Sequence, residues 1–164
     1  SGTAVGMSHR FEGRATAGMG RLRGFHMREI FAVGTPEQVT SFRDTLLNDQ
    51  IDFLKHYCIN GVVETASDPF FVDDYSAKRM YQMGLELKHE VKMALPYDQT
   101  ELAVSSLNYH QEFFSKAFNI TAHGDSPVHS CCLGFGIDRW CIAIFSQHGL
   151  DVGKWPNALQ ELLK

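Results

Sequence analysis

Long apolar runs are missing from this sequence, and no stretch is long enough to span a membrane. The start of the chain has no signal-peptide pattern either, so we expect no membrane association. Cysteine is scarce: Cys58, Cys131, Cys132 and Cys141 form neither a CxxC pair nor a disulfide framework. This sparse usage favours a reducing compartment, and we expect a cytoplasmic protein.

An excess of positive charge is lacking as well. The chain has 15 Lys and Arg against 19 Asp and Glu, for a formal net charge of -4. Non-specific nucleic-acid binding usually requires a basic surface, so this balance argues against it. What the 164 residues do contain is 44% hydrophobic side chains, enough for one domain with a sizeable core.

The order of predicted elements defines the fold class. Strands over 5–12 and 25–33 form a hairpin around the Gly- and Arg-rich loop 13–24. Thr35-Pro36-Glu37-Gln38 has the pattern of a helix start, and an apolar stripe continues to about Cys58. The remaining predictions are strands over 61–65, 87–95, 101–108 and 130–135, and helices over 74–84, 110–118, 136–147 and from about 153 onward. Few of these units resemble parallel βαβ crossovers, so we expect an α+β domain with an antiparallel sheet flanked by helices.

The first chemical candidates are Arg10 and Glu12. In a strand, the Arg-x-Glu spacing puts both side chains on the same face of the sheet. A salt bridge along that face is one interpretation. The other is a guanidinium that binds a phosphate, because the planar fork of arginine matches phosphate oxygens.

A second group follows a glycine-flanked turn late in the chain. Gly134 and Gly136 would let a ligand approach the backbone closely. Arg139 comes next, in an otherwise apolar helix, where a buried cation needs a ligand or an acid as its partner. Phe25, at the start of the second strand, is either a core residue or an aromatic platform.

Together these motifs resemble the catalytic core of the class II aminoacyl-tRNA synthetases of the seryl type. Arg10-x-Glu12 is similar to motif 2, residues 18–25 (GMGRLRGF) to the stretch after it, and residues 134–139 (GFGIDR) to motif 3. The stretch 106–110 (SLNYH), Cys132, and the ending with Trp155-Pro156 resemble a smaller branch, the amino acid:[carrier protein] ligases, which are truncated homologues of atypical seryl-tRNA synthetases.

The resemblance implies an ATP-dependent, adenylate-forming ligase. Arg10 and Arg139 would be catalytic, with Arg10 on the α-phosphate and Arg139 on the γ-phosphate. Glu12 would contact the adenine amino group and Phe25 one adenine face. A small amino acid, glycine or alanine, would be activated and passed to the phosphopantetheine thiol of a carrier protein.

The same branch holds zinc that binds the substrate amine through two cysteines and a glutamate. Glu29 and Cys132 match two of these ligands, although a buried structural thiol is the commoner role of such a cysteine. Glu29 and Asn108 would contact the substrate. For Mg2+, the family's usual acid is absent before Ser105, and Glu101 is the nearest acid, so we assign Glu101 to ATP binding.

Two further expectations concern partners. Lys78 and Arg79 lie on the predicted helix 74–84, in the region where the ligase branch docks its acidic carrier protein; a solvated face is the alternative. The chain has no room for the family's motif 1 or for the first zinc cysteine. We therefore expect residues 1–164 to be one catalytic-core domain that lacks an N-terminal portion, with a homodimer in the full-length protein.

Two other functions stay open. One is a fragment of a seryl-type tRNA ligase, although the acidic charge balance makes tRNA an unlikely partner. The other is a non-catalytic paralogue, against which the retention of Arg10, Glu12, Phe25 and Arg139 argues.

Overall fold

The protein is described by a computed structural model over residues 1–10, 18–66, 87–122 and 128–164. One six-stranded sheet has the order β1-β2-β6-β5-β4-β3, and every neighbouring pair is antiparallel. The strands are β1 (Gly2–His9), β2 (Gly24–Gly34), β3 (Gly61–Thr65), β4 (Lys88–Leu95), β5 (Thr100–Gln111) and β6 (His129–Gly136). The helices are α1 (Pro36–His56), α3 (Phe113–Phe118), α4 (Ile137–His148) and α5 (Asn157–Glu161), with a 3-10 turn η1 (Val152–Lys154). This architecture confirms the predicted α+β class.

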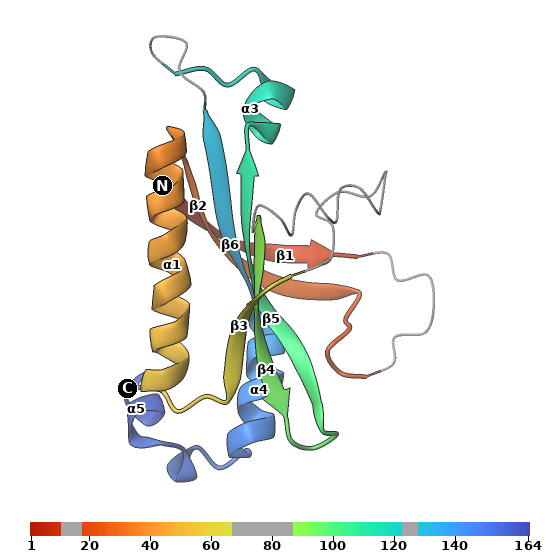
Figure 1. Ribbon diagram of the computed structural model, residues 1–164. Helices are drawn as coiled ribbons and strands as arrows, with labels where there is room; N and C mark the ends of the chain where they lie inside the picture. The colour runs from red at the N-terminus through yellow and green to blue at the C-terminus, as the bar shows by residue number, and fades with distance from the viewer. Residues whose placement is uncertain (11–17, 67–86, 123–127) are drawn as a thin grey trace.

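Figure 1 shows α1 lying alongside the sheet, with α3 at one end of the sheet and α4 and α5 at the other. The start of α1 is the predicted capping box: Gln38 N donates to Thr35 Oγ1 at 3.4 Å, and Thr35 N donates to Gln38 Oε1 at 3.0 Å. The helix ends at His56, close to the predicted end, and Cys58 then adopts a left-handed φ of 56°.

The two faces of the sheet differ in character, as the alternation in 87–95 predicts. His89, Val91, Met93 and Leu95 are buried, whereas the residues between them are half-buried. The buried face packs under α1 and α4: Leu46 of α1 joins Leu107 and Leu133, and Ala143 of α4 joins Val91, Met93 and Leu95. The opposite face carries the polar side chains of β4 and, as shown below, the candidate site.

The first strand differs from its prediction. It covers Gly2–His9 rather than 5–12, so Arg10 follows the strand instead of lying within it. The hairpin pairing nevertheless continues by one bond, because Arg10 N donates to the Arg23 carbonyl at 2.9 Å.

The predicted helix 110–118 was wrong at its start. β5 continues to Gln111 because Tyr109 and Gln111 pair with Cys131 and Ser130 of β6, and sheet pairing outweighs local propensity. Only Phe113–Phe118 is helical. Near the end of the chain, residues 152–154 form a 3-10 turn, and the last helix begins after Pro156 rather than near Gly153.

The predicted helix 74–84 lies outside the described residues. Among the residues that the structure does describe, no helix combines the length and the apolar character needed to cross a membrane.

Candidate active site

Sheet register brings the predicted site residues to one face. β2 pairs with β6 so that Glu29 is opposite Gly134 and Phe31 is opposite Cys132. β5 pairs with β6 so that Asn108 is opposite Cys132. Directly paired residues point to the same side of an antiparallel sheet, and residues two apart in a strand do so too. Glu29, Cys132, Asn108 and Phe25 therefore share the face away from α1.

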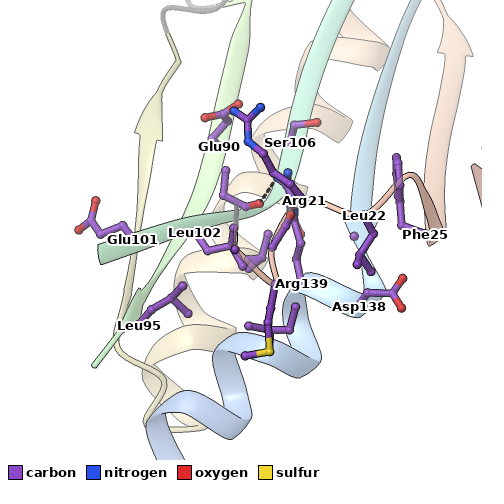
Figure 2. Close-up of a pocket in the computed structure, with 18 of the residues that line it drawn as sticks. Arg21, Leu22, Phe25, Glu90, Leu95, Glu101, Leu102, Ser106, Asp138 and Arg139 are labelled. Atoms are coloured by element: carbon purple, nitrogen blue, oxygen red, sulfur yellow. Dashed lines mark hydrogen bonds between the residues drawn. The ribbon is translucent and has the colours of Figure 1, made fainter. Parts of the chain in front are cut away.

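A polar cavity of about 570 Å3 lies on this face, at the end near α4. Four predicted nucleotide-binding residues line it from four places in the chain: Arg10 after β1, Phe25 in β2, Glu101 in β5 and Arg139 in α4. Figure 2 shows Phe25, Glu101 and Arg139 around this cavity. We call it the first cavity.

Arg10 and Phe25 form a pair at the edge of the first cavity. The Arg10 guanidinium carbon lies over the Phe25 ring, 5.4 Å from its centroid. Such cation–π stacking holds a guanidinium in place without using its N–H donors, which stay available for an anion. Glu12, predicted to act beside Arg10, lies outside the described residues.

Arg139 donates two hydrogen bonds to backbone carbonyls. Its Nε donates to the Gly20 carbonyl at 2.9 Å and its Nη1 to the Ala103 carbonyl at 2.8 Å. Backbone carbonyls of two separate segments accept these two donors, and the expectation that Arg139 also faces an acid or a ligand stays a prediction. Arg139 thus ties the segment after residue 17 to β5 while lining the first cavity.

Asp138, which sequence reasoning missed, connects α4 to β2. Its Oδ2 accepts the His26 N–H at 2.6 Å and lies 3.5 Å from His26 Nδ1. The backbone hydrogen bond from His26 is the main cause of a lowered pKa for this carboxyl. The carboxylate also lies in the first turn of a helix, where negative charge is favourable.

Sequence reasoning also did not identify Glu90 and Lys88 as site residues. Their side chains pair at 2.8 Å, each only 14% exposed, and both line the first cavity. Figure 2 shows Glu90 and Arg21 pointing toward one another. The alternation of β4 gave the signal, since it put Lys88 and Glu90 on the polar face, but nothing local showed that this face forms a cavity wall.

A second, mostly apolar cavity of about 420 Å3 adjoins Glu29 and Cys132 near α3. His110 and His129 also line it, as does Phe114. Cys132 Sγ lies 3.6 Å from His110 Nε2 and 3.8 Å from Asn108 Nδ2. Burial is the main cause that raises the pKa of the Cys132 thiol to about 11, and the Glu29 charge adds to it; burial lowers the pKa of His110 to about 4.

The neighbouring cysteine points the other way, as predicted. Cys131 is 1% exposed, and its thiol approaches the Val39 carbonyl of α1 at 3.9 Å. The two adjacent thiols therefore belong to different environments: Cys131 to the core and Cys132 to the site.

The side-chain amide of Asn108 has a hydrogen-bond partner for its nitrogen but none for its oxygen among the described residues. The residue is 5% exposed, and its Nδ2 donates to Ser106 Oγ at 3.2 Å. Its buried Oδ1 has no hydrogen-bond partner among the described residues. A buried acceptor without a donor costs about 1–3 kcal/mol, and a bound ammonium group would supply the donor.

The zinc expectation stays a prediction, although two of its expected donors come together here. Glu29 and Cys132 line the same cavity, and an anionic carboxylate beside a thiol is a suitable pair of zinc donors. Across residues 1–10, 18–66, 87–122 and 128–164, however, no group of three or more His, Cys, Asp or Glu side chains could hold a metal ion. The described residues thus offer two donors and no complete set.

Known proteins are similar to this chain in sequence or in fold. The amino acid–[acyl-carrier-protein] ligase 1 of Bradyrhizobium diazoefficiens is 34% identical over 143 residues, 87% of this chain and 44% of that protein. The type-2 serine–tRNA ligase of Methanococcus aeolicus is 28% identical over 163 residues, 95% of this chain and 31% of that protein. The M. kandleri seryl-tRNA synthetase, solved with A. aeolicus tRNASec, superposes with a TM-score of 0.82 at 24% identity, over 97% of this chain and 32% of that chain.

The chain is a homologue of seryl-type class II synthetase cores. This confirms the resemblance and the class II core fold expected from the motifs. No protein-family model matches the chain. The chain spans less than half the length of the curated relatives that it matches.

Within this class II core, the two partner-docking candidates remain untested. Lys78 and Arg79 lie outside the described residues, as does Glu12. Of the other predicted residues, Arg10, Phe25, Glu101 and Arg139 gather at the first cavity, and Glu29 and Cys132 at the second.

Proposed function

We propose that this chain activates a small amino acid, glycine or alanine, with ATP and passes it to the phosphopantetheine thiol of a carrier protein. One observation carries the proposal. A single sheet face holds an arginine–aromatic pair, Arg10 and Phe25, at one end, and the group Glu29, Cys132 and Asn108 at the other. The first pair suits a nucleotide, and the second group suits an amine.

The reaction would have two steps. An oxygen of the amino-acid carboxylate attacks the α-phosphorus of ATP, the bond from this phosphorus to the bridging oxygen breaks, and pyrophosphate leaves. The carrier thiol then attacks the carbonyl carbon of the aminoacyl adenylate, the bond from this carbon to the oxygen that bridges it to phosphorus breaks, AMP leaves with that bridging oxygen, and the thiol proton goes to solvent. Catalysis would consist of positioning and charge stabilisation, with Arg10 on the α-phosphate.

Other residues would hold the substrates. Phe25 would stack on adenine, Glu12 would bind its amino group, and Arg139 would reach the γ-phosphate from its position on the cavity wall. Asn108 Oδ1 and Glu29 would accept hydrogen bonds from the substrate ammonium. Glu101 would contribute to binding Mg2+-ATP from β5.

Zinc remains part of this proposal. Glu29 and Cys132 would supply two of its ligands, and when bound the ion would select the substrate by its free amine. We also propose that residues 1–164 are one catalytic-core domain of a protein that acts as a homodimer.

Pyrophosphate exchange tests the activation step. The chain, and the longest reading frame that contains it, should exchange pyrophosphate into ATP with glycine or alanine. Arg10→Met should abolish the exchange, whereas Arg28→Met, on the other face of β2, should preserve it. No exchange with any amino acid in the longest form would contradict the proposal and favour the non-catalytic paralogue.

The transfer step separates the carrier ligase from a seryl-type tRNA ligase, the alternative that the Methanococcus relative supports. Label from glycyl adenylate should move to a phosphopantetheinylated carrier protein and not to tRNA. Transfer to tRNA would establish the alternative. Replacing Lys78 and Arg79 by Glu should impair loading of the carrier without slowing adenylate formation; if both steps fell together, the docking assignment would be wrong.

A further inference from the structure

Met27 occupies the middle of the candidate site. Along β2 it lies between Phe25 and Glu29 on the same face. Residues four apart in an antiparallel strand are separated by about 14 Å, so Met27 stands about 7 Å from each. It also lines the first cavity with Arg10 and Phe25.

The strands on both sides of Met27 contribute no side chain of their own at this level of the sheet, although the Arg139 side chain of α4 lies over Gly136. Gly6 of β1 and Gly136 of β6 are directly opposite Met27. A Cβ on Gly6 would meet no atom within 4 Å. Met27 is thus the single side chain in this row across β1, β2 and β6.

The Met27 side chain leans along the sheet toward the amine-binding end. A Cβ placed on Gly134 would lie 3.1 Å from Met27 Cε and 3.8 Å from Glu29 Oε1. The methionine methyl group and the glutamate carboxylate therefore lie close together above Gly134. They cover the floor that an amino acid would cross between the two ends of the site.

From this geometry we propose that Met27 determines substrate size and makes glycine the preferred amino acid. The inference rests on the proposed function: with the substrate ammonium at Glu29 and its carboxylate turned toward Arg10, the substrate α-carbon passes over Gly134 and Met27. A substrate side chain directed at the sheet would meet the Met27 methyl group. Glycine has none, and alanine would need Met27 to shift.

The expected discrimination between glycine and alanine can be compared with values for other apolar pockets. A methylene group more or less in an apolar pocket changes the specificity constant by about 10–200-fold. Met27→Ala removes the covering side chain and should open room for the alanine methyl group. Met27→Leu keeps a similar volume and should retain the preference for glycine.

Binding of glycyl- and alanyl-sulfamoyl adenosine, unreactive analogues of the two adenylates, tests this directly by calorimetry. Wild type and Met27→Leu should bind the glycyl analogue more tightly, and Met27→Ala should lower that ratio by about 10-fold or more. Met7→Ala is the matched control, because Met7 is 58% exposed and pairs with His26, on the other face of the hairpin. Melting curves show that the variants are folded.

The outcomes separate the two proposals. An unchanged glycine-to-alanine ratio in folded Met27→Ala, with wild type binding either analogue, would overturn the role of Met27 and leave the proposed function standing. A wild-type protein that binds neither analogue and exchanges no pyrophosphate would overturn the proposed function, and the role of Met27 with it.

Discussion

Asp138 accepts the backbone N–H of His26 at 2.6 Å, although 112 positions separate the two residues in the chain. The bond joins the first turn of α4 to β2. Together with the two carbonyl bonds of Arg139, it fixes the late glycine-flanked motif against the early arginine-rich one. The relative position of these two segments, which we propose bind the nucleotide, therefore depends on adjacent residues of α4.

The Asp138 bond predicts a pH dependence of stability. A carboxyl whose folded pKa is lowered stabilises the fold above its unfolded pKa, about 3.9, and loses this contribution as the pH falls through the folded pKa. At neutral pH, Asp138→Asn should lower the free energy of unfolding by about 0.5–1 kcal/mol, since the side chain is partly exposed.

Urea denaturation at pH 7, 5 and 3 measures this effect. The difference between wild type and Asp138→Asn should be the same at pH 7 and 5 and smaller at pH 3. Glu161→Gln, at an exposed position of α5, should show no such trend. A difference that grows toward pH 3 would contradict the assignment.

Removing the charged head of Arg139 should destabilise the fold near the first cavity. Arg139→Met keeps most of the apolar stem but loses the donors to Gly20 and Ala103, and charged hydrogen bonds contribute about 1.5–3 kcal/mol each. Urea unfolding should show a loss of about this size, and amide exchange should rise at residues 18–22. Arg28→Met, an exposed arginine of β2, should change stability by less than about 0.5 kcal/mol. Equal losses in both variants would argue against a specific role for these bonds.

Asn108 should separate stability from substrate binding. Asn108→Leu removes a buried acceptor without a partner among the described residues, and also the donor to Ser106, so the two effects should cancel to within about 1 kcal/mol. Affinity for the amino acid should fall by about 10-fold or more, because the ammonium loses an acceptor. Unfolding curves and the amino-acid KM in pyrophosphate exchange give the two readouts. A large loss of stability with an unchanged KM would show that Asn108 is structural.

Cys132 should be unreactive until the pH is high. With a pKa of about 11, only on the order of one thiol in a thousand is ionised at pH 8, and alkylation should accelerate about tenfold per pH unit. Cys58 and Cys141, which are exposed, serve as references in the same chain. Mass spectrometry after iodoacetamide treatment of metal-free protein gives the rates. Rapid modification of Cys132 at pH 8 would contradict its half-buried, neutral state.

Zinc content tests the ligand assignment separately. Wild-type protein dialysed against zinc should retain the ion, and Cys132→Ser should retain much less, whereas Cys141→Ser should match wild type. Cobalt substitution should give a thiolate charge-transfer band that Cys132→Ser lacks. Equal metal content in all three proteins would remove Cys132 from the ligand set.

Local sequence signals predicted most of the fold. The capping box at Thr35 and the alternation in 87–95 were confirmed because both depend on contacts within a few residues. The start of the predicted helix 110–118 was wrong because Gln111 pairs with Ser130, 19 positions away, and local propensity does not encode such pairing. The same limit explains why the first strand was placed three residues too late.

In the candidate site, too, the sequence identified some residues and missed those whose role depends on distant parts of the chain. Motif resemblance identified Arg10, Phe25 and Arg139 as residues that meet, and the structure brings them to one cavity. It did not identify Asp138 or Glu90, whose partners come from other segments or whose setting depends on how the sheet face is enclosed. Nor did it identify Met27, whose position matters only because Gly6, Gly134 and Gly136 surround it.

The two adjacent cysteines of β6 show that the core and the candidate site both depend on the register of this strand. Side chains in a strand alternate between faces, so a slip of one residue in β6 would move Cys131 into the site and Cys132 under α1. Gly134 would leave the site floor in the same slip, and Leu133 would leave the core. A single-residue insertion in β6 would thus disable folding and chemistry together, and the strand can diverge by substitution far more readily than by changes in length.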